Sequence, residues 1–135
     1  MLSTLTLAVL ITGCPLTSTA VDVELVQDDK GKTFSITVGQ IVSITLPSNV
    51  STGYAWELDE LDADILENTN QRYNSSSSTA PGSGGEEVWQ FTARDTGIIV
   101  VRLEYRRSWE DDTIDPADVY QVTFKITEEV EEADS

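Results

Sequence analysis

Apolar and polar residues alternate along much of this chain, most clearly toward its C-terminal end. One set of alternate positions is apolar in each of three segments, Trp89–Ala93, Ile99–Tyr105 and Tyr120–Ile126. Successive side chains of a β-strand point to opposite faces of the sheet, so this period of two predicts three strands, each with one buried face.

Shorter stretches of the same kind occur in the first half of the chain. We predict strands at Val21–Leu25, Phe34–Val38, Ile41–Leu46 and Ala55–Leu58. The third of them should end at Pro47 because proline has no N–H to donate to a neighbouring strand.

Two segments lack this alternation. Residues 58–66 have weak helical spacing and many acidic side chains, which predicts at most one helical turn. Residues 73–85 are rich in Ser, Gly, Thr and Pro, a composition typical of a flexible surface loop.

Short strands with turns at regular spacing predict an all-β fold, an antiparallel Ig-like β-sandwich of about seven to eight strands. The sandwich should span residues 21–127, and residues 128–135 should form an acidic tail. The chain contains 135 residues, the usual size of one domain.

Charge and composition exclude several classes of function. The formal net charge is -16, which argues against nucleic acid as a partner because phosphate contacts require basic residues. The chain has no histidine and one cysteine, Cys14, so it lacks the imidazole of a Ser-His-Asp or Cys-His system and the usual zinc ligands. We therefore expect a binding protein that needs no cofactor, and not an enzyme.

The first 20 residues have a different character. Residues 1–13 are apolar and uncharged, the size of a signal-peptide apolar region, and lack the usual basic residue at the start. Ile11-Thr12-Gly13-Cys14 resembles the lipobox of prokaryotic lipoproteins. The resemblance implies lipidation of Cys14, a tether over residues 14–20, and export to the outer face of a membrane, in the periplasm or at the cell surface. The alternative is a buried first strand with a free cysteine.

Three loop segments stand out by their order and spacing: Asn49–Tyr54 (NVSTGY), Gly82–Gly85 (GSGG) and Arg107–Glu110 (RSWE). Together they resemble the chagasin family, which has Asn-Pro-Thr-Thr-Gly-Tyr, Gly-x-Gly-Gly and Arg-Pro-Trp at the corresponding places. Val50 and Ser108 replace the two prolines, which removes some preorganisation of the loops.

The resemblance implies a monomeric, reversible inhibitor of papain-like cysteine proteases whose three loops cluster at one end of the sandwich and enter the active-site cleft. Its contact with a membrane would be through the lipid alone. The residues implied to bind the protease are Asn49, Ser51, Thr52, Gly53, Tyr54, Gly82, Gly84, Gly85, Arg107 and Trp109.

Each loop has a physical role in this interpretation, and a plainer alternative. Gly53 keeps the first loop narrow, but the same residues could form an ordinary hairpin turn. Gly84 and Gly85 could pair through their backbone with the protease, or serve as a linker. Trp109 could be a binding hot spot, or it could have a core or edge-packing role. We expect Asn49 to brace its own turn through its side chain.

Two other functions stay open at this stage. One is a surface-displayed Ig-like adhesion or ligand-binding module without inhibitory activity. The other is a carboxylate enzyme or calcium site that uses Asp111, Asp112 and Asp115, although the segment lacks the spacing of a calcium loop.

Overall fold

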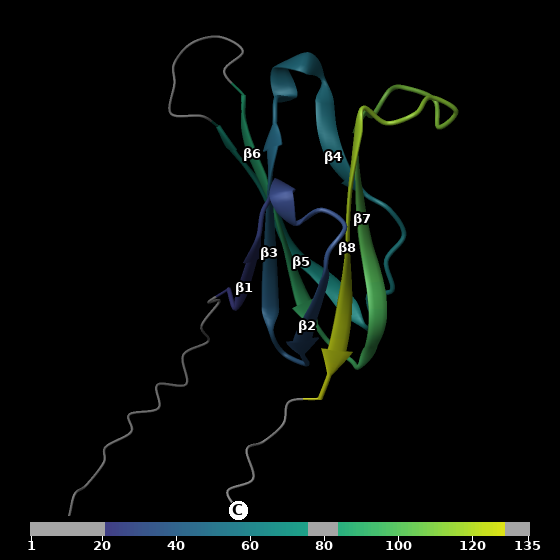
Figure 1. Cartoon of the computed structure of the whole chain (residues 1–135). Coiled ribbons are helices and arrows are strands. Elements are labelled where there is room, and N and C mark those ends of the chain that lie inside the picture. The colour runs from purple at the N-terminus through teal and green to yellow at the C-terminus, as the bar shows by residue number, and fades with distance from the viewer. Residues whose placement is uncertain (1–20, 76–83, 129–135) are drawn as a thin grey trace, which may run out of the picture.

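The protein folds into two four-stranded sheets packed face to face (Figure 1). A computed structural model describes residues 21–75 and 84–128. The first sheet has the strand order β1 (Val23–Leu25), β3 (Ile41–Ser48), β6 (Gly85–Ala93) and β5 (Leu66–Ser75). The second sheet has the order β2 (Thr33–Thr37), β8 (Asp118–Thr127), β7 (Gly97–Arg107) and β4 (Tyr54–Leu58). Two short 3-10 turns, η1 (Gln27–Asp29) and η2 (Val50–Thr52), complete the elements of these residues. The predicted β-sandwich is confirmed.

Two of the strand pairs are parallel, which departs from the antiparallel pattern that we expected. β1 runs parallel to β3, and β2 runs parallel to β8. The N-terminal part of the chain alternates between the two sheets, so β1 and β2 each join an edge as a short added strand. The direction of such a pair depends on contacts far apart in the sequence, and local alternation carries no information about it.

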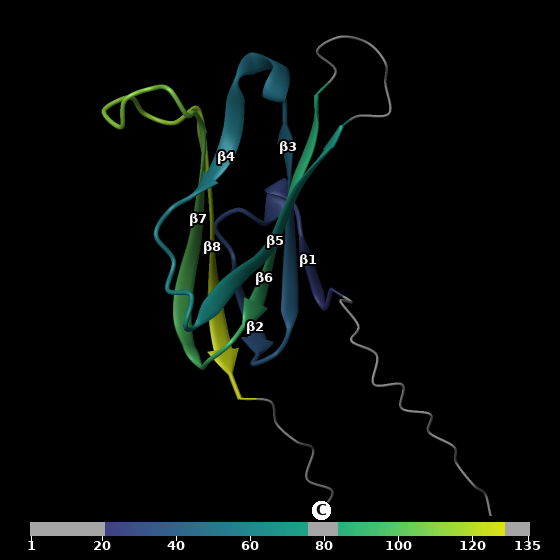
Figure 2. The same cartoon turned by 180° about the vertical axis from the view of Figure 1, so that it is seen from behind.

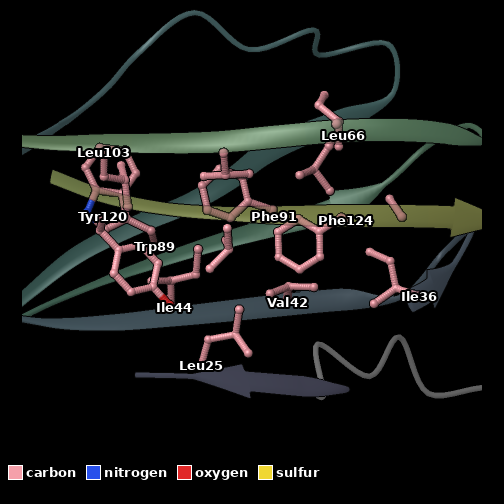
Figure 3. Packing of buried hydrophobic residues seen from close by; sticks show 14 of the residues in the cluster. Leu25, Ile36, Val42, Ile44, Leu66, Trp89, Phe91, Leu103, Tyr120 and Phe124 are labelled. Carbon is pink, nitrogen blue, oxygen red and sulfur yellow. The ribbon is translucent and has the colours of Figure 1, made fainter. Parts of the chain in front are cut away.

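The core lies between the inner faces of the sheets, where side chains from β3, β6 and β8 point toward one another (Figure 3). Phe91 of the first sheet and Phe124 of the second are both fully buried. Burial of one large apolar side chain contributes about 1.5–3 kcal/mol. The alternating positions predicted in β6, β7 and β8 supply much of this core: Trp89, Phe91, Ala93, Ile99, Val101, Leu103, Tyr120, Val122, Phe124 and Ile126.

Two strands are longer than their sequences suggest. β3 continues through Pro47, whose backbone faces away from β6 and whose carbonyl accepts a hydrogen bond from Trp56 Nε1 at 3.0 Å. The missing donor of this proline therefore falls on the open side of the strand. β5 reaches Ser75, so the predicted loop over residues 73–85 is wrong at both ends. β5 is an edge strand with only Leu66 buried, so it shows no apolar alternation.

The described residues of the three loop segments that stand out in the sequence lie at one end of the sandwich. The β3–β4 and β7–β8 connections and the first residues of β6 meet there, while β8 ends at the opposite end (Figures 1 and 2). The β3–β4 connection crosses from one sheet to the other, and we call residues 48–54 the arch. No helix among the described residues is long and apolar enough to cross a membrane.

Candidate functional site

The arch is held in shape by its own side chains. Asn49 Oδ1 accepts hydrogen bonds from Ser51 N at 3.2 Å and from Ser51 Oγ at 2.5 Å. Thr52 Oγ1 donates to the Asn49 carbonyl at 2.6 Å. The expected bracing by Asn49 is confirmed. The hairpin alternative is wrong, since the arch joins strands of different sheets.

Gly53 ends the η2 turn of the arch in a left-handed conformation. Its φ is 84°, and its N–H donates to the Val50 carbonyl at 3.0 Å. Residues with a Cβ adopt this region at a cost, so the turn requires glycine.

Aromatic rings anchor the arch to the second sheet. Tyr54 stacks on Tyr105 with ring centroids 5.3 Å apart, and the buried Trp56 lies 4.9 Å from the same ring. Tyr105 Oη also accepts a hydrogen bond from Asn49 N at 2.9 Å. The sequence placed Tyr105 on the core face of its strand and gave no sign of this second role. Tyr105 thus fixes both ends of the arch.

Arg107 ties the third loop to the arch. Its Nε donates to the Thr52 carbonyl at 3.1 Å, and its guanidinium carbon lies 4.4 Å from the centre of the Tyr54 ring. The same guanidinium is 5.9 Å from the Trp109 ring, and Nη1 is 3.5 Å from Glu110 Oε1. Arg107 is therefore engaged on several sides within the protein itself.

Trp109 is exposed and lies against Gly53. The residue is 68% exposed, so the expectation of a core role is wrong. A Cβ built on Gly53 would lie 2.1 Å from Trp109 Cη2, closer than any real contact of this kind. The indole ring thus covers the face that Gly53 leaves free. The first and third loops form one surface, with a large flat ring beside a narrow backbone.

The glycine segment differs from our expectation. Gly85 pairs with Ser48 of β3 on one side and with Ser75 of β5 on the other, so it lies inside the sheet. A Cβ on Gly85 would lie 2.2 Å from the Asn74 carbonyl oxygen, so packing within the sheet requires glycine here. Gly84, with a φ of 78°, precedes the ladder at the loop end. Gly82 lies outside the described residues.

A groove of about 370 Å³ opens between the arch and the start of β6, and Asp118 lines one side. Burial of Asp118 would raise its pKa, but hydrogen bonds from Lys30 Nζ, Val119 N and Gln27 Nε2 outweigh this effect and lower it. The carboxyl is therefore ionised at neutral pH. Three groups stabilise that charge, so it belongs to the local structure and not to acid-base chemistry.

The acidic run after Trp109 shows no arrangement for metal binding. Asp111 Oδ1 accepts a hydrogen bond from Thr113 N at 3.1 Å within its own turn. Among the residues that the structure describes, no group of three His, Cys, Asp or Glu side chains is placed to hold a metal ion. The geometry thus offers no support for a calcium site at Asp111, Asp112 and Asp115.

Comparison with known families decides among the remaining interpretations. The model of the chagasin family, peptidase inhibitor I42, matches residues 35–124, which is more than half of the chain. The chain belongs to this family. The match covers the arch, the glycine segment and Arg107–Trp109, so the three loops lie within the shared domain. Membership places the protein among inhibitors and not among enzymes.

Individual relatives agree with this assignment. Chagasin of Trypanosoma cruzi is 34% identical over 83 residues, which cover 58% of this chain and 76% of that protein. Amoebiasin-1 of Entamoeba histolytica is 33% identical over 88 residues, covering 63% and 82%.

Solved structures share the fold. The solution structure of amebosin superimposes with a TM-score of 0.64 at 28% identity, over 78% of this chain and 97% of that one. The crystal structure of the cysteine protease inhibitor EhICP2 of Entamoeba histolytica gives 0.70 at 21% identity, over 80% and 100%. The second likeness concerns the fold alone.

Proposed function

We propose that this protein is a reversible inhibitor of papain-like cysteine proteases and that its loop end enters the active-site cleft. Family membership supports the inhibitory activity. The observation that carries the proposed geometry is the contact between Gly53 and the exposed Trp109, which joins two loops into one surface. The family assignment gives no support to the alternative of an adhesion module.

The arch would occupy the catalytic centre of the protease. Gly53 presents backbone without a side chain, so this part of the arch is narrow enough to approach a recessed nucleophile. The arch crosses between sheets and is fastened at Asn49, Tyr54 and Arg107. A segment held this firmly blocks the site without adopting the extended form of a cleaved substrate.

The other two loops would hold the rims of the cleft. Trp109 offers a large rigid ring at a low cost in conformational entropy, which is typical of a binding hot spot. Gly84 and the preceding glycine, Gly82, would offer backbone groups to a strand of the protease. Gly85 has no part in that pairing, because both of its neighbours are strands of its own sheet.

The direct test is titration of the soluble domain, residues 21–128, against several papain-like proteases, with residual activity as the readout. We expect tight inhibition that is reversed on dilution, and intact inhibitor after prolonged incubation. Gly53→Glu should abolish inhibition because a side chain at this position would strain the left-handed turn and displace Trp109 from its place beside the arch. Absence of inhibition across the panel would refute the proposal.

We further propose that the protein is exported and held at a membrane by lipid on Cys14, on the basis of the lipobox-like Ile11–Cys14 segment. Cys14 and the rest of this segment lie outside the described residues. In a prokaryotic host, Cys14→Ser should move the protein from the membrane fraction to the soluble fraction. Unchanged partitioning would exclude the anchor and leave the inhibitory function untouched.

A further inference from the structure

Glu87 is an acidic residue inside the sandwich. It lies in β6 and is only 5% exposed. It also falls on the inward face of that strand, in phase with Trp89 and Phe91. Burial of a carboxylate is unfavourable unless hydrogen bonds compensate for the water that it loses, so its bonding partners are informative.

Glu87 accepts hydrogen bonds from residues on both sides of the arch, one in β3 and one in β4. Oε2 accepts a hydrogen bond from Ser48 Oγ at 2.6 Å and another from Trp56 N at 3.0 Å. Ser48 is the last residue of β3, and Trp56 is the third residue of β4. Both are buried, at 5% and 3% exposure. One buried carboxylate oxygen therefore links the end of β3 to β4, the two strands that the arch connects.

The bond to Trp56 also fills a gap in the second sheet. β4 is the edge strand of that sheet, so backbone groups on one of its sides have no strand neighbour. Glu87 comes from the opposite sheet and takes the place of that neighbour for one N–H group. This hydrogen bond thus connects the two sheets next to the arch. Glu87 lies two residues after Gly85, the first residue of β6.

We propose that Glu87 is a positioning residue, which sets the spacing and orientation of the arch relative to the start of β6 and so determines inhibitory affinity. It touches no protease in this interpretation and acts through Ser48 and Trp56. The inference rests on the proposed function for its effect on inhibition, while its effect on the arch is independent of that function.

The test compares Glu87→Leu with Glu87→Gln and Glu86→Gln. Leucine removes both acceptors, whereas the glutamine oxygen accepts from the same two donors. Glu86 is the adjacent, exposed carboxylate, so its variant matches the charge change. At a temperature where every variant is folded, we expect Glu87→Leu to weaken inhibition about 10- to 100-fold. The two glutamine variants should stay within about threefold of wild type.

Amide hydrogen exchange followed by NMR gives a second readout. In Glu87→Leu, the amides of Trp56 and of residues 49–53 should exchange faster, while those in the middle of β7 and β8 stay protected. A role in stability alone would instead accelerate exchange throughout, and would leave the inhibition constant of the folded protein unchanged. Should Glu87→Leu fail to fold, Ser48→Ala removes one donor and should weaken inhibition about 3- to 10-fold.

The two proposals fail in different ways. If wild type inhibits a protease and Glu87→Leu inhibits it equally well, the positioning role is overturned and the proposed function stands. If wild type inhibits none, the proposed function is refuted, and unchanged exchange at Trp56 and residues 49–53 would overturn the role of Glu87 as well.

Discussion

The interior of the sandwich and its loop end are built in different ways. Between the sheets, contacts join apolar side chains such as Phe91, Phe124 and Val101, and each position requires mainly an apolar group of suitable volume. At the loop end, contacts depend on particular atoms. The face of Gly53 is covered by Trp109, and the Nε of Arg107 donates to the Thr52 carbonyl.

This difference separates two properties of the protein. Free energy of unfolding is supplied mostly by the interior, whereas affinity should depend on a few groups that contribute little to that free energy. Variants of the two regions should therefore move stability and inhibition independently, and the following experiments test that separation.

The largest effect is expected from a core truncation at the fully buried Phe124. Phe124→Ala should lower the free energy of unfolding by about 3–5 kcal/mol because it leaves a cavity between the sheets. Phe124→Leu should cost less, since it retains more of the volume. Urea denaturation gives the stabilities. Inhibition by the folded protein should stay within about threefold, in the range of a substitution that leaves the interface intact. A large change in inhibition by both variants would show that the regions are coupled.

The next largest effect is expected from alanine substitution at Gly53, compared with the same substitution at Gly31, a glycine with the same backbone conformation. Gly53 and Gly31 have φ values of 84° and 83°, but a Cβ has open space around it only at Gly31. Alanine at either position should cost about 1–2 kcal/mol of stability, from the left-handed conformation. At Gly53 the methyl group must also displace Trp109, which we expect to weaken inhibition about 100-fold through loss of the hot-spot geometry.

Melting temperatures and inhibition constants of the two glycine variants decide this prediction. Equal losses of stability with a loss of inhibition only in Gly53→Ala would confirm the role of the ring contact. Equal inhibition by both variants would mean that Trp109 moves aside without consequence.

The fold was predictable where one face of a strand is buried. Alternation located β6, β7 and β8 because their inward residues are almost all apolar. It missed most of β5, which lies at a sheet edge with nine of its ten residues partly or fully exposed. It also carried no information on the parallel pairs, because those depend on the path of the chain between sheets.

The site was predictable from motifs but not from alternation. The structure brings Asn49, Gly53, Tyr54, Arg107 and Trp109 together through contacts between segments more than 50 residues apart. It reassigns Gly85 to the sheet, because register with β3 and β5 is a property of the folded chain.

The sequence contains an indication of the buried position of Glu87. Counting back by twos from Phe91 and Trp89 leads to a glutamate on the inward face of β6. A charged residue in phase with core residues suggests a specific buried partner.

Trp109→Ala tests the hot spot without the backbone strain that a substitution of Gly53 introduces. Truncation of a central aromatic residue typically costs at least about 2 kcal/mol of binding free energy, so inhibition should weaken about 30-fold. Stability should change by less than about 0.5 kcal/mol because the side chain is largely exposed. Ile114→Ala removes another exposed apolar side chain from the same loop and should alter inhibition less than about threefold. Similar losses in both variants would indicate a broad apolar contact instead of a single anchor.

The smallest effect is expected at Arg107. Lysine keeps the charge but lacks the planar guanidinium that faces Tyr54 while its Nε bonds the Thr52 carbonyl. Loss of this brace should cost about 1 kcal/mol, or five- to tenfold in the inhibition constant. The matched control is Arg94→Lys in the β6–β7 turn at the opposite end, where Nη2 lies 2.7 Å from Glu67 Oε1, and inhibition should not change.

A double-mutant cycle between Arg107→Lys and Tyr54→Leu then identifies how Arg107 acts. If Arg107 braces the arch through the Tyr54 ring, the second substitution should add little to the first, because either one removes the same contact. If the guanidinium instead binds an acidic residue of the protease, the two losses should add, and the loss at Arg107 should shrink as salt is raised. Stacking on Tyr54, the bond to Thr52 and the ion pair with Glu110 leave this guanidinium few free donors. We therefore expect non-additive losses with little dependence on salt.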